Sequence, residues 1–276
     1  MARSAIGQTH RKGAEGTPAP LLATDEPLPV EHIAARRDPF VFVCEHASNR
    51  MPRALGDLGL PREAFRRHIA YDPGAEALTR GLAARFGGAA VLQAYSRLVI
   101  DCNREPTLPD AITPFSEDTE IPGNAGLDGP AREARIAAVW TPFHAALDAL
   151  FGARLAEGRP TALVTIHSYT PVWRGIARPW HVGIIQTGDR RMADPMLAAL
   201  GREAGLVVGD DQPYSAKDNV DYTIRRHGRA RGIPHVMIEV RNDLLADTAA
   251  VAGWTDRLAA ALAETAARIG LPAAKD

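Results

Sequence analysis

The sequence feature that most constrains the fold is an alternation of short apolar runs with amphipathic stretches of helical periodicity. The apolar runs at 40–44, 161–166 and 234–240 are continuous, which is typical of strands buried on both faces of a sheet. Helical spacing of apolar residues instead marks the stretches between the runs, as at Leu78 and Leu82. Strands that alternate with helices predict an α/β fold with a mostly parallel or mixed central sheet and helices on both faces.

The remaining helices and strands are predicted from the same patterns and from glycine and proline residues, which commonly end such elements. Further strands are predicted at 89–94, 97–102, 181–186 and 206–208, and helices at 61–69, 75–86, 130–157, 193–204, 222–231 and 247–269. Residues 1–37 are rich in glycine and proline and predict a partly flexible tail, which leaves 38–276 as a single domain. The irregular segment 105–128 is long for a loop in a compact domain, so we expect it to be functional or mobile, for example as a lid.

The charge balance and the positions of the cysteines indicate which class of partner and which cellular compartment to expect. Lys plus Arg number 32 against 33 for Asp plus Glu, so bulk charge gives no reason to expect a nucleic acid or an anionic membrane as partner. Cys44 and Cys102 both lie in strand-like runs, which suits a reducing compartment. No apolar run reaches the roughly 18 residues of a membrane span. We expect a cytoplasmic protein with a small-molecule partner, and the oligomeric state stays open.

Polar residues stand where several predicted strands end. His46, His167 and Glu239 each follow or close a buried run, and Asn103 with Arg104 follows the predicted strand 97–102. The carboxyl ends of parallel strands are where ligands bind in open α/β sheets. Two imidazoles and a carboxylate are the ligands of many catalytic zinc sites, which keep one position open. A histidine at a strand end can equally be a satisfied structural residue, and spacing alone does not show that these ends meet.

Short motifs in a fixed order carry a resemblance to a known family. They are Cys44-Glu45-His46-Ala47-Ser48-Asn49, Tyr71-Asp72-Pro73-Gly74, Ser96 to Arg104, Ile166-His167-Ser168 and Ile238 to Asp243. Together they resemble the N-formylglutamate amidohydrolase family, whose fold is similar to that of the zinc carboxypeptidases and of the aspartoacylase and succinylglutamate desuccinylase deacylases. The resemblance implies a zinc carboxypeptidase-like (phosphorylase/hydrolase-like) fold and a Zn²⁺-dependent enzyme that cleaves N-formyl or small N-acyl amino acids.

The resemblance also implies roles for individual residues. His46 and His167 match the metal histidines, Glu239 matches the catalytic glutamate, and Asn103-Arg104 matches a pair that binds a substrate carboxylate. The carboxypeptidase-like enzymes carry a glutamate ligand three residues after the first metal histidine, and here that position is Asn49. A neutral amide is a poor zinc ligand. Asp72 is therefore our first candidate for the third ligand and Glu45 the second.

The expected reaction suggests roles for the other polar residues. Glu239 would act as general base, and Arg97 would stabilise the negative charge that develops on the amide oxygen. The planar guanidinium of Arg104 suits an α-carboxylate, with Asn103 as an additional donor. His181 and Tyr214 are candidates to contact the substrate.

Structural roles remain the alternative for several of these residues. Glu239 could form a salt bridge with Arg241, and Arg97 could simply pair with other charges. Cys44 is expected in the core rather than as a nucleophile. The remaining histidines of the domain are expected to be structural or on the surface: His68, His144, His227 and His235. Trp173 is expected to anchor a loop or to form a hydrophobic wall.

The sequence thus favours a zinc amidohydrolase that removes a formyl or other small acyl group from an amino acid with a free carboxylate. A carboxypeptidase-like peptidase or a deacylase for larger acyl groups is the alternative among enzymes. A binding protein that retains the carboxylate site without metal chemistry is the alternative from another class, and Asn49 is the observation that favours it.

Overall fold

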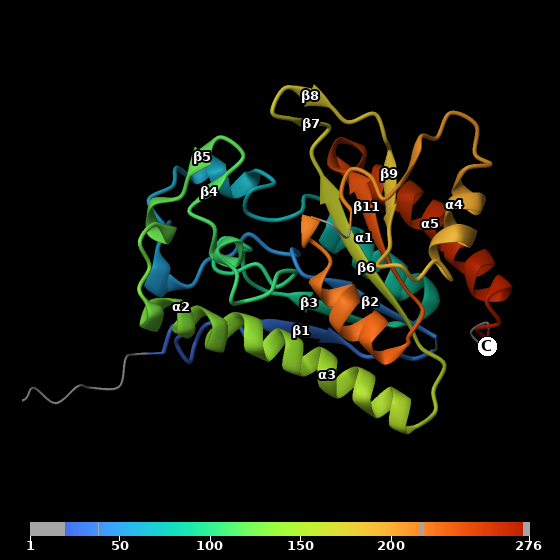
Figure 1. Ribbon diagram of the computed structural model, residues 1–276, viewed down its shortest axis with the longest axis horizontal. Coiled ribbons are helices and arrows are strands. Elements are labelled where there is room, and N and C mark those ends of the chain that lie inside the picture. The colour runs from blue at the N-terminus through green and yellow to red at the C-terminus, as the bar shows by residue number, and fades with distance from the viewer. Residues whose placement is uncertain (1–19, 38, 216–217, 273–276) are drawn as a thin grey trace, which may run out of the picture.

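The computed structural model describes residues 20–37, 39–215 and 218–272. The first half of the predicted tail, residues 1–19, therefore lies outside the described residues, as do residues 273–276. The structure is built around one mixed sheet with helices on both sides (Figure 1). This arrangement confirms the predicted α/β class.

Seven strands form the central sheet. Their order is β1 (Val30–Ile33), β3 (Ala89–Gln93), β2 (Phe40–Cys44), β6 (Ala162–Tyr169), β11 (His235–Arg241), β9 (Val182–Ile185) and β10 (Val208–Asp210). The four strands β3, β2, β6 and β11 run parallel, whereas β1 and β9 pair antiparallel to their inner neighbours. The carboxyl ends of β2, β6 and β11 consequently meet at one edge of the sheet.

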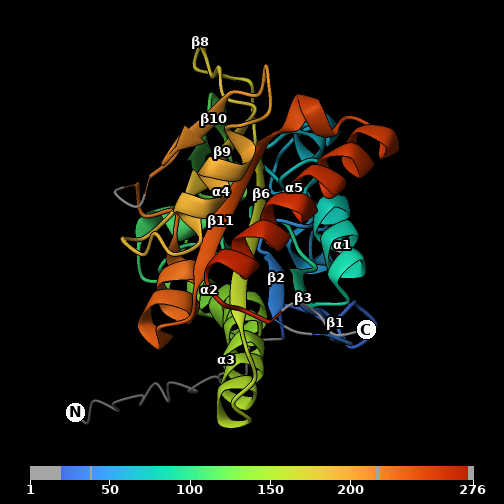
Figure 2. The ribbon, with the colours of Figure 1, turned by 90° about the vertical axis from the view of Figure 1, so that its right-hand side faces the viewer.

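One face of the sheet is covered by three helices, α1 (Ala75–Phe86), α4 (Ala193–Leu200) and α5 (Thr248–Arg268), as Figure 2 shows. Phe42 of β2 points to this side and packs in the same cluster as Leu78 and Leu82 of α1. The bounds of α1 agree with the sequence prediction, because Gly87 ends the helix in the left-handed conformation that glycine tolerates best (φ 63°).

The opposite face is covered by a continuous helical segment made of α2 (Gly129–Arg135), a π-helical turn (Ile136–Trp140) and α3 (Thr141–Ala156). Val41 and Val43 of β2 point to this side, since neighbouring residues of a strand alternate between faces. Among the described residues, Gly129–Ala156 is the one helical stretch long and apolar enough to cross a membrane. Here its apolar residues, Phe143 among them, pack against the sheet, as those of a core helix do.

The remaining elements are short. Two hairpins pair β4 (Phe115–Ser116) with β5 (Thr119–Glu120) and β7 (Val172–Trp173) with β8 (Ile176–Ala177). Short 3-10 helices lie at Arg53–Leu55, Arg62–Arg66, Pro109–Ile112, Pro122–Asn124, Arg229–Arg231 and Asn242–Leu245, and a second π-helical turn spans Ile224–Gly228. The helix predicted at 61–69 is thus only the short segment Arg62–Arg66.

One predicted strand is absent from the structure, and one observed strand was not predicted. The run 97–102 is a series of turns in which Val99 N–H bonds to Ser96 O and Asp101 N–H bonds to Ala111 O. Its apolar side chains are buried, and Val99, Ile100 and Cys102 pack in the same core cluster as the strands and α3. A short buried run does not by itself distinguish strand from loop. Conversely, β1 lies within the predicted tail and pairs antiparallel with β3. An edge strand of four half-exposed residues between prolines leaves little pattern in the sequence.

We predict that Gly183 in β9 is indispensable to the sheet. A Cβ atom at this position would lie 1.7 Å from the backbone oxygen of Gln212, which cannot move away as a side chain would. The variant Gly183→Ala should lower the free energy of unfolding by about 3 kcal/mol or more, measured by urea denaturation.

Gly152 in α3 provides the matched control, because nothing lies within 4 Å of the same added atom there. In that helix, Gly152→Ala should raise the free energy of unfolding by about 0.5–1 kcal/mol. A Gly183→Ala protein as stable as the wild type would contradict the assigned packing.

Candidate metal centre and active-site cavity

The sheet brings three of the predicted site residues to the same edge. His46 lies two residues beyond the end of β2, and His167 and Glu239 lie in β6 and β11, where they face each other in the parallel register. Asp72 joins them from the turn before α1, because its N–H bonds to the carbonyl oxygen of His46 at 3.0 Å. The predicted meeting of these strand ends is therefore observed.

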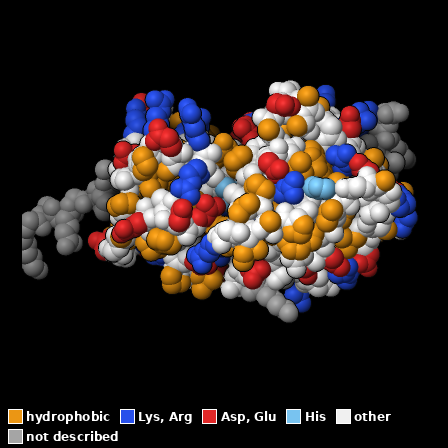
Figure 3. Space-filling model, turned by 90° about the horizontal axis from the view of Figure 1, so that it is seen from above, with side chains coloured by type: hydrophobic (Ala, Val, Ile, Leu, Met, Phe, Trp, Pro, Cys, Tyr) orange, Lys and Arg blue, Asp and Glu red, His pale blue; other side chains and the backbone are white. Residues whose placement is uncertain are grey.

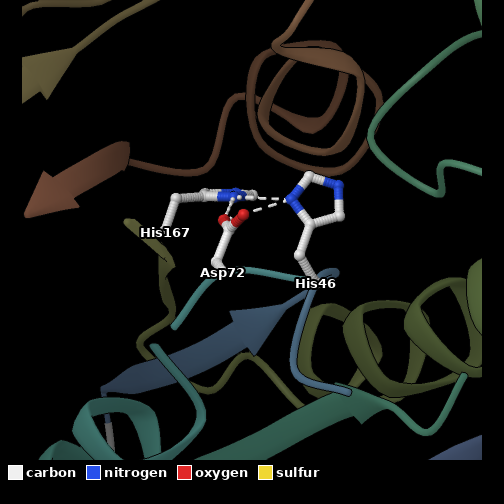
Figure 4. Close-up of side chains that lie close together, drawn as sticks. All are labelled: His46, Asp72 and His167. Atoms are coloured by element: carbon white, nitrogen blue, oxygen red, sulfur yellow. Dashed lines mark hydrogen bonds and ion pairs between the residues drawn. The ribbon is translucent and has the colours of Figure 1, made fainter. Parts of the chain in front are cut away.

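Three donor atoms of the cluster converge on one point (Figure 4). The Nδ1 atoms of His46 and His167 lie 3.2 Å apart, and Asp72 Oδ2 lies 3.2 Å from the first and 3.0 Å from the second. In a tetrahedral zinc site with bonds near 2.05 Å, neighbouring donors are about 3.3 Å apart. All three side chains are buried. The spacing and chemistry of these donors fit a small divalent cation.

The outer nitrogens of both imidazoles face buried carboxylates. His46 Nε2 lies 2.7 Å from Asp101 Oδ1, and His167 Nε2 lies 3.1 Å from Glu45 Oε2. A histidine that binds a metal commonly directs its other nitrogen to a carboxylate in this way, which fixes the tautomer and the ring orientation. The structure therefore places Asp72 at the shared point and Glu45 behind His167.

The close approach of buried carboxylates and imidazoles shifts the pKa values of the cluster. Burial disfavours the imidazolium form, but the adjacent carboxylates outweigh it and raise the pKa of His167 well above its ordinary value. Burial likewise opposes ionisation of Asp72, yet His46 and the other histidines around it hold the pKa of that carboxyl well below its usual range. The carboxylates therefore stay charged and attract positive charge, which protons or a metal cation can supply.

The cluster forms one wall of a cavity of about 180 Å³. Figure 3 looks down on the molecule from this end and shows the surface hollowed between two lobes, with histidine in the hollow. The predicted site residues that line the cavity are His46, Asp72, Arg97, Asn103, Arg104, His167, Tyr214 and Glu239. His181 does not line it; its Nδ1 accepts a hydrogen bond from Val207 N–H, so the structure does not bring this residue to the site.

Glu239 stands out among the lining residues because it lacks a partner. It is 5% exposed, and its Oε2 has no hydrogen-bond partner among the residues that the structure describes. Burial raises the pKa of Glu239 to about 7. Arg241, its alternative partner from the sequence, instead pairs with Asp243 at 2.8 Å. The position of Glu239 thus suits a group that exchanges protons.

The two arginines of the cavity are both tied to carboxylates. Arg97 donates to Asp101 at 2.6 Å and to Asp72 at 3.3 Å, and its side chain is 21% exposed. Arg104 pairs with Asp110. Each has an anionic partner already, and each keeps part of its guanidinium toward the cavity.

Asn103, the expected additional substrate donor, lines the cavity and is also held by backbone groups. Its Nδ2 donates to Val220 O at 2.5 Å, and its Oδ1 accepts from Thr223 N–H at 3.0 Å. Both ends of the amide are therefore engaged with backbone. Asn103 ties the loop before Arg104 to the segment around residue 220 with one of the two N–H groups of its Nδ2, and its role as a substrate donor stays a prediction.

The sequence interpretation missed His68. Its Nε2 lies 3.1 Å from Asp72 Oδ1 and 2.7 Å from the carbonyl oxygen of Ser168, and the residue lines the cavity. The sequence feature that could have identified His68 as a site residue is its position four residues before Asp72. Asn49, by contrast, donates to Phe65 O at 2.7 Å and takes no part in the cluster.

Two further residues of the cavity come from the hairpins. Ser116 of β4 belongs to the segment 105–128, and Trp173 belongs to β7. The predicted functional loop therefore does reach the site, whereas its closure as a lid stays a prediction. Trp173 forms part of a cavity wall, which was one of its two expected roles.

Comparisons with known proteins agree with the geometry. The sequence matches the N-formylglutamate amidohydrolase family (FGase) over residues 38–246. The gene product Atu2144 from Agrobacterium tumefaciens is 40% identical with a TM-score of 0.88, over 91% of this chain and 99% of that one. The N-formylglutamate amidohydrolase from Ralstonia eutropha JMP134 shares the fold, with 20% identity and a TM-score of 0.63 over 88% of this chain and 98% of that one. No curated protein matches the sequence. The chain belongs to the N-formylglutamate amidohydrolase family.

Proposed function

We propose that this protein hydrolyses the amide bond of N-formyl amino acids such as N-formylglutamate, releasing formate and the free amino acid, with Zn²⁺ as cofactor. The observation that carries this proposal is the convergence of His46, Asp72 and His167 next to a buried, unpartnered Glu239 in one cavity. Membership of the family supports the reaction class.

The donor set supports zinc as the cofactor. Two Nδ1 atoms and one carboxylate oxygen at mutual distances of 3.0–3.2 Å would hold the ion and leave further coordination positions open toward the cavity. Bound zinc activates water for attack and polarises a carbonyl oxygen. Asp101 and Glu45 would fix the two imidazoles in the tautomer that exposes Nδ1 to the ion.

Glu239 is the proposed general base. Its carboxylate would take a proton from the attacking water and return it to the departing amino group. Burial raises its pKa to about 7. A neighbouring cation favours the carboxylate form. Glu239 would therefore be ionised and ready to accept a proton at neutral pH in the metal-loaded protein.

Arg97 and Arg104 are the proposed electrostatic contacts to the substrate. Arg97 adjoins Asp72 and would stabilise the negative charge on the amide oxygen in the transition state. Arg104 would bind the α-carboxylate, while Asn103 holds the Arg104 loop in place.

The cellular compartment and the class of partner that we propose are those predicted from the sequence. We propose a cytoplasmic enzyme whose partner is a small N-acyl amino acid with a free carboxylate, and nothing in its charge balance calls for nucleic acid. A carboxylate-binding protein without metal chemistry is the rival. The rival explains neither the carboxylate behind each imidazole nor the unpartnered Glu239.

The first test is Glu239→Gln, which keeps the shape of the side chain and removes the base. We expect formate release from N-formylglutamate to fall by about 10²–10⁴-fold, with zinc content unchanged. Glu133→Gln, an exposed glutamate of α2, is the matched control and should retain wild-type activity. Full activity in the Glu239→Gln protein would refute the assigned mechanism.

The second test concerns the carboxylate behind His46. Asp101→Asn should weaken zinc binding about 10–100-fold, because the imidazole loses the charge that orients it and raises its basicity. Competition with a fluorescent zinc chelator gives the affinity. Asp110→Asn removes a carboxylate of the same region that contacts Arg104 and no histidine, so its zinc affinity should match the wild type. Equal losses in both variants would show that Asp101 has no specific role at the metal.

A further inference from the structure

Arg178 differs from the arginines already placed in the cavity because it has no acidic partner. It is 8% exposed, yet among the described residues no carboxylate forms an ion pair with it. Arg97 and Arg104, by comparison, each pair with aspartates. A buried cation without an anion is costly, so a compensating interaction is expected.

Aromatic rings supply part of that compensation. The guanidinium carbon of Arg178 lies 5.0 Å from the ring centre of Tyr214, 5.1 Å from that of Trp173 and 5.5 Å from that of Tyr169. Such cation–π contacts offset part of the desolvation of the arginine. They leave its full positive charge in place directly behind Tyr214 and Trp173, which line the cavity.

Tyr214 lies between the guanidinium of Arg178 and the cavity and contacts both. Arg178 Nη1 donates a hydrogen bond to the phenolic oxygen of Tyr214 at 3.3 Å. The phenolic oxygen therefore acts as acceptor in this bond, and its own proton has no acceptor among the described residues. The hydroxyl of Tyr169 provides a contrast, because it donates to Trp180 O at 2.6 Å. Burial also raises the pKa of Tyr214 to about 12, so the phenol keeps its proton at neutral pH.

We propose that Arg178, acting through Tyr214, selects substrates that carry a second carboxylate on the amino-acid side chain. The Tyr214 hydroxyl would donate to that carboxylate, and the positive charge of Arg178 behind it would favour an anion over a neutral group. Arg178 is thus a positioning and specificity-determining residue, and Tyr214 makes the contact. This inference rests on the proposed function and assigns the recognition of the side chain, which the roles of Arg97 and Arg104 leave open.

The test compares N-formylglutamate with N-formylglutamine, which differ only in the charge of the side-chain terminus. Formate release gives kcat/KM for both substrates with the zinc-loaded full-length protein. The wild type should prefer N-formylglutamate, and Arg178→Gln should reduce that preference about 10–100-fold, the usual contribution of a hydrogen bond to a charged group. The loss should fall on N-formylglutamate and leave the rate with N-formylglutamine little changed.

Companion variants separate recognition from structure. Tyr214→Phe should reduce the same preference, and the double variant should lose little more than either single variant, because both act on one interaction. Arg178→Lys should restore part of the preference through its charge. Arg257→Gln removes another arginine stacked on a tryptophan, Trp254 on the far helix α5, and should behave as the wild type.

The outcomes discriminate clearly. An equal loss on both substrates in the Arg178→Gln and Tyr214→Phe proteins would show a structural role and overturn the inference, as would an unchanged preference. A loss seen instead when the α-carboxylate is replaced by an amide would mean that Arg178 serves the other carboxylate, which also overturns it. Absence of formate release from either substrate in the zinc-loaded wild type would refute the proposed function itself.

Discussion

The interaction on which the rest of the site depends is the pairing of two buried imidazoles with two buried carboxylates. Asp101 holds His46 from one side, and Glu45 holds His167 from the other. Each pair turns an Nδ1 atom toward Asp72, so the three donor atoms lie close together. Burying so many carboxylates is unfavourable unless positive charge compensates them, and Arg97, protonated imidazoles or a metal cation can supply that charge.

The sheet explains why these groups can meet. Parallel pairing of β6 with β11 sets Glu239 opposite His167, and β2 next to β6 delivers His46 to the same edge. The residues that interact with substrate in our proposal come from loops that this edge supports, as is common for function in α/β proteins. Buried strands thus position the proposed metal ligands and the proposed base, while the hairpins and the 97–104 segment contribute residues around the cavity.

Much of this could be predicted from the sequence, and the failures have physical reasons. Buried strands that end in His46, His167 and Glu239 were recognisable because continuous apolar runs stop abruptly at polar residues. The loop at 97–102 was mistaken for a strand because its apolar side chains are as buried as those of a strand. Hydrogen bonds across long sequence separations left no local signal. The occupied amide of Asn103 and the contact of His68 with Ser168 are examples.

Arg178 is the clearest example of a residue whose surroundings could not be predicted from the sequence. Nothing near it in the chain shows that its guanidinium lies beside Tyr214, which is 36 residues away, or that acidic partners are missing. An absent partner can be recognised only when the surroundings of a side chain are known. The same holds for Glu239, whose proposed role as a base is supported by the lack of a hydrogen-bond partner for its Oε2 among the described residues.

We propose that His46, Asp72 and His167 together hold one zinc ion. X-ray absorption spectroscopy at the zinc edge of the stoichiometrically loaded protein tests it most directly. We expect one zinc per chain with nitrogen and oxygen ligands at about 2.0–2.1 Å, the scattering signature of two imidazoles, and loss of one imidazole in His167→Ala. Sulfur ligation, or a spectrum that is the same in the wild type and in His167→Ala, would contradict it.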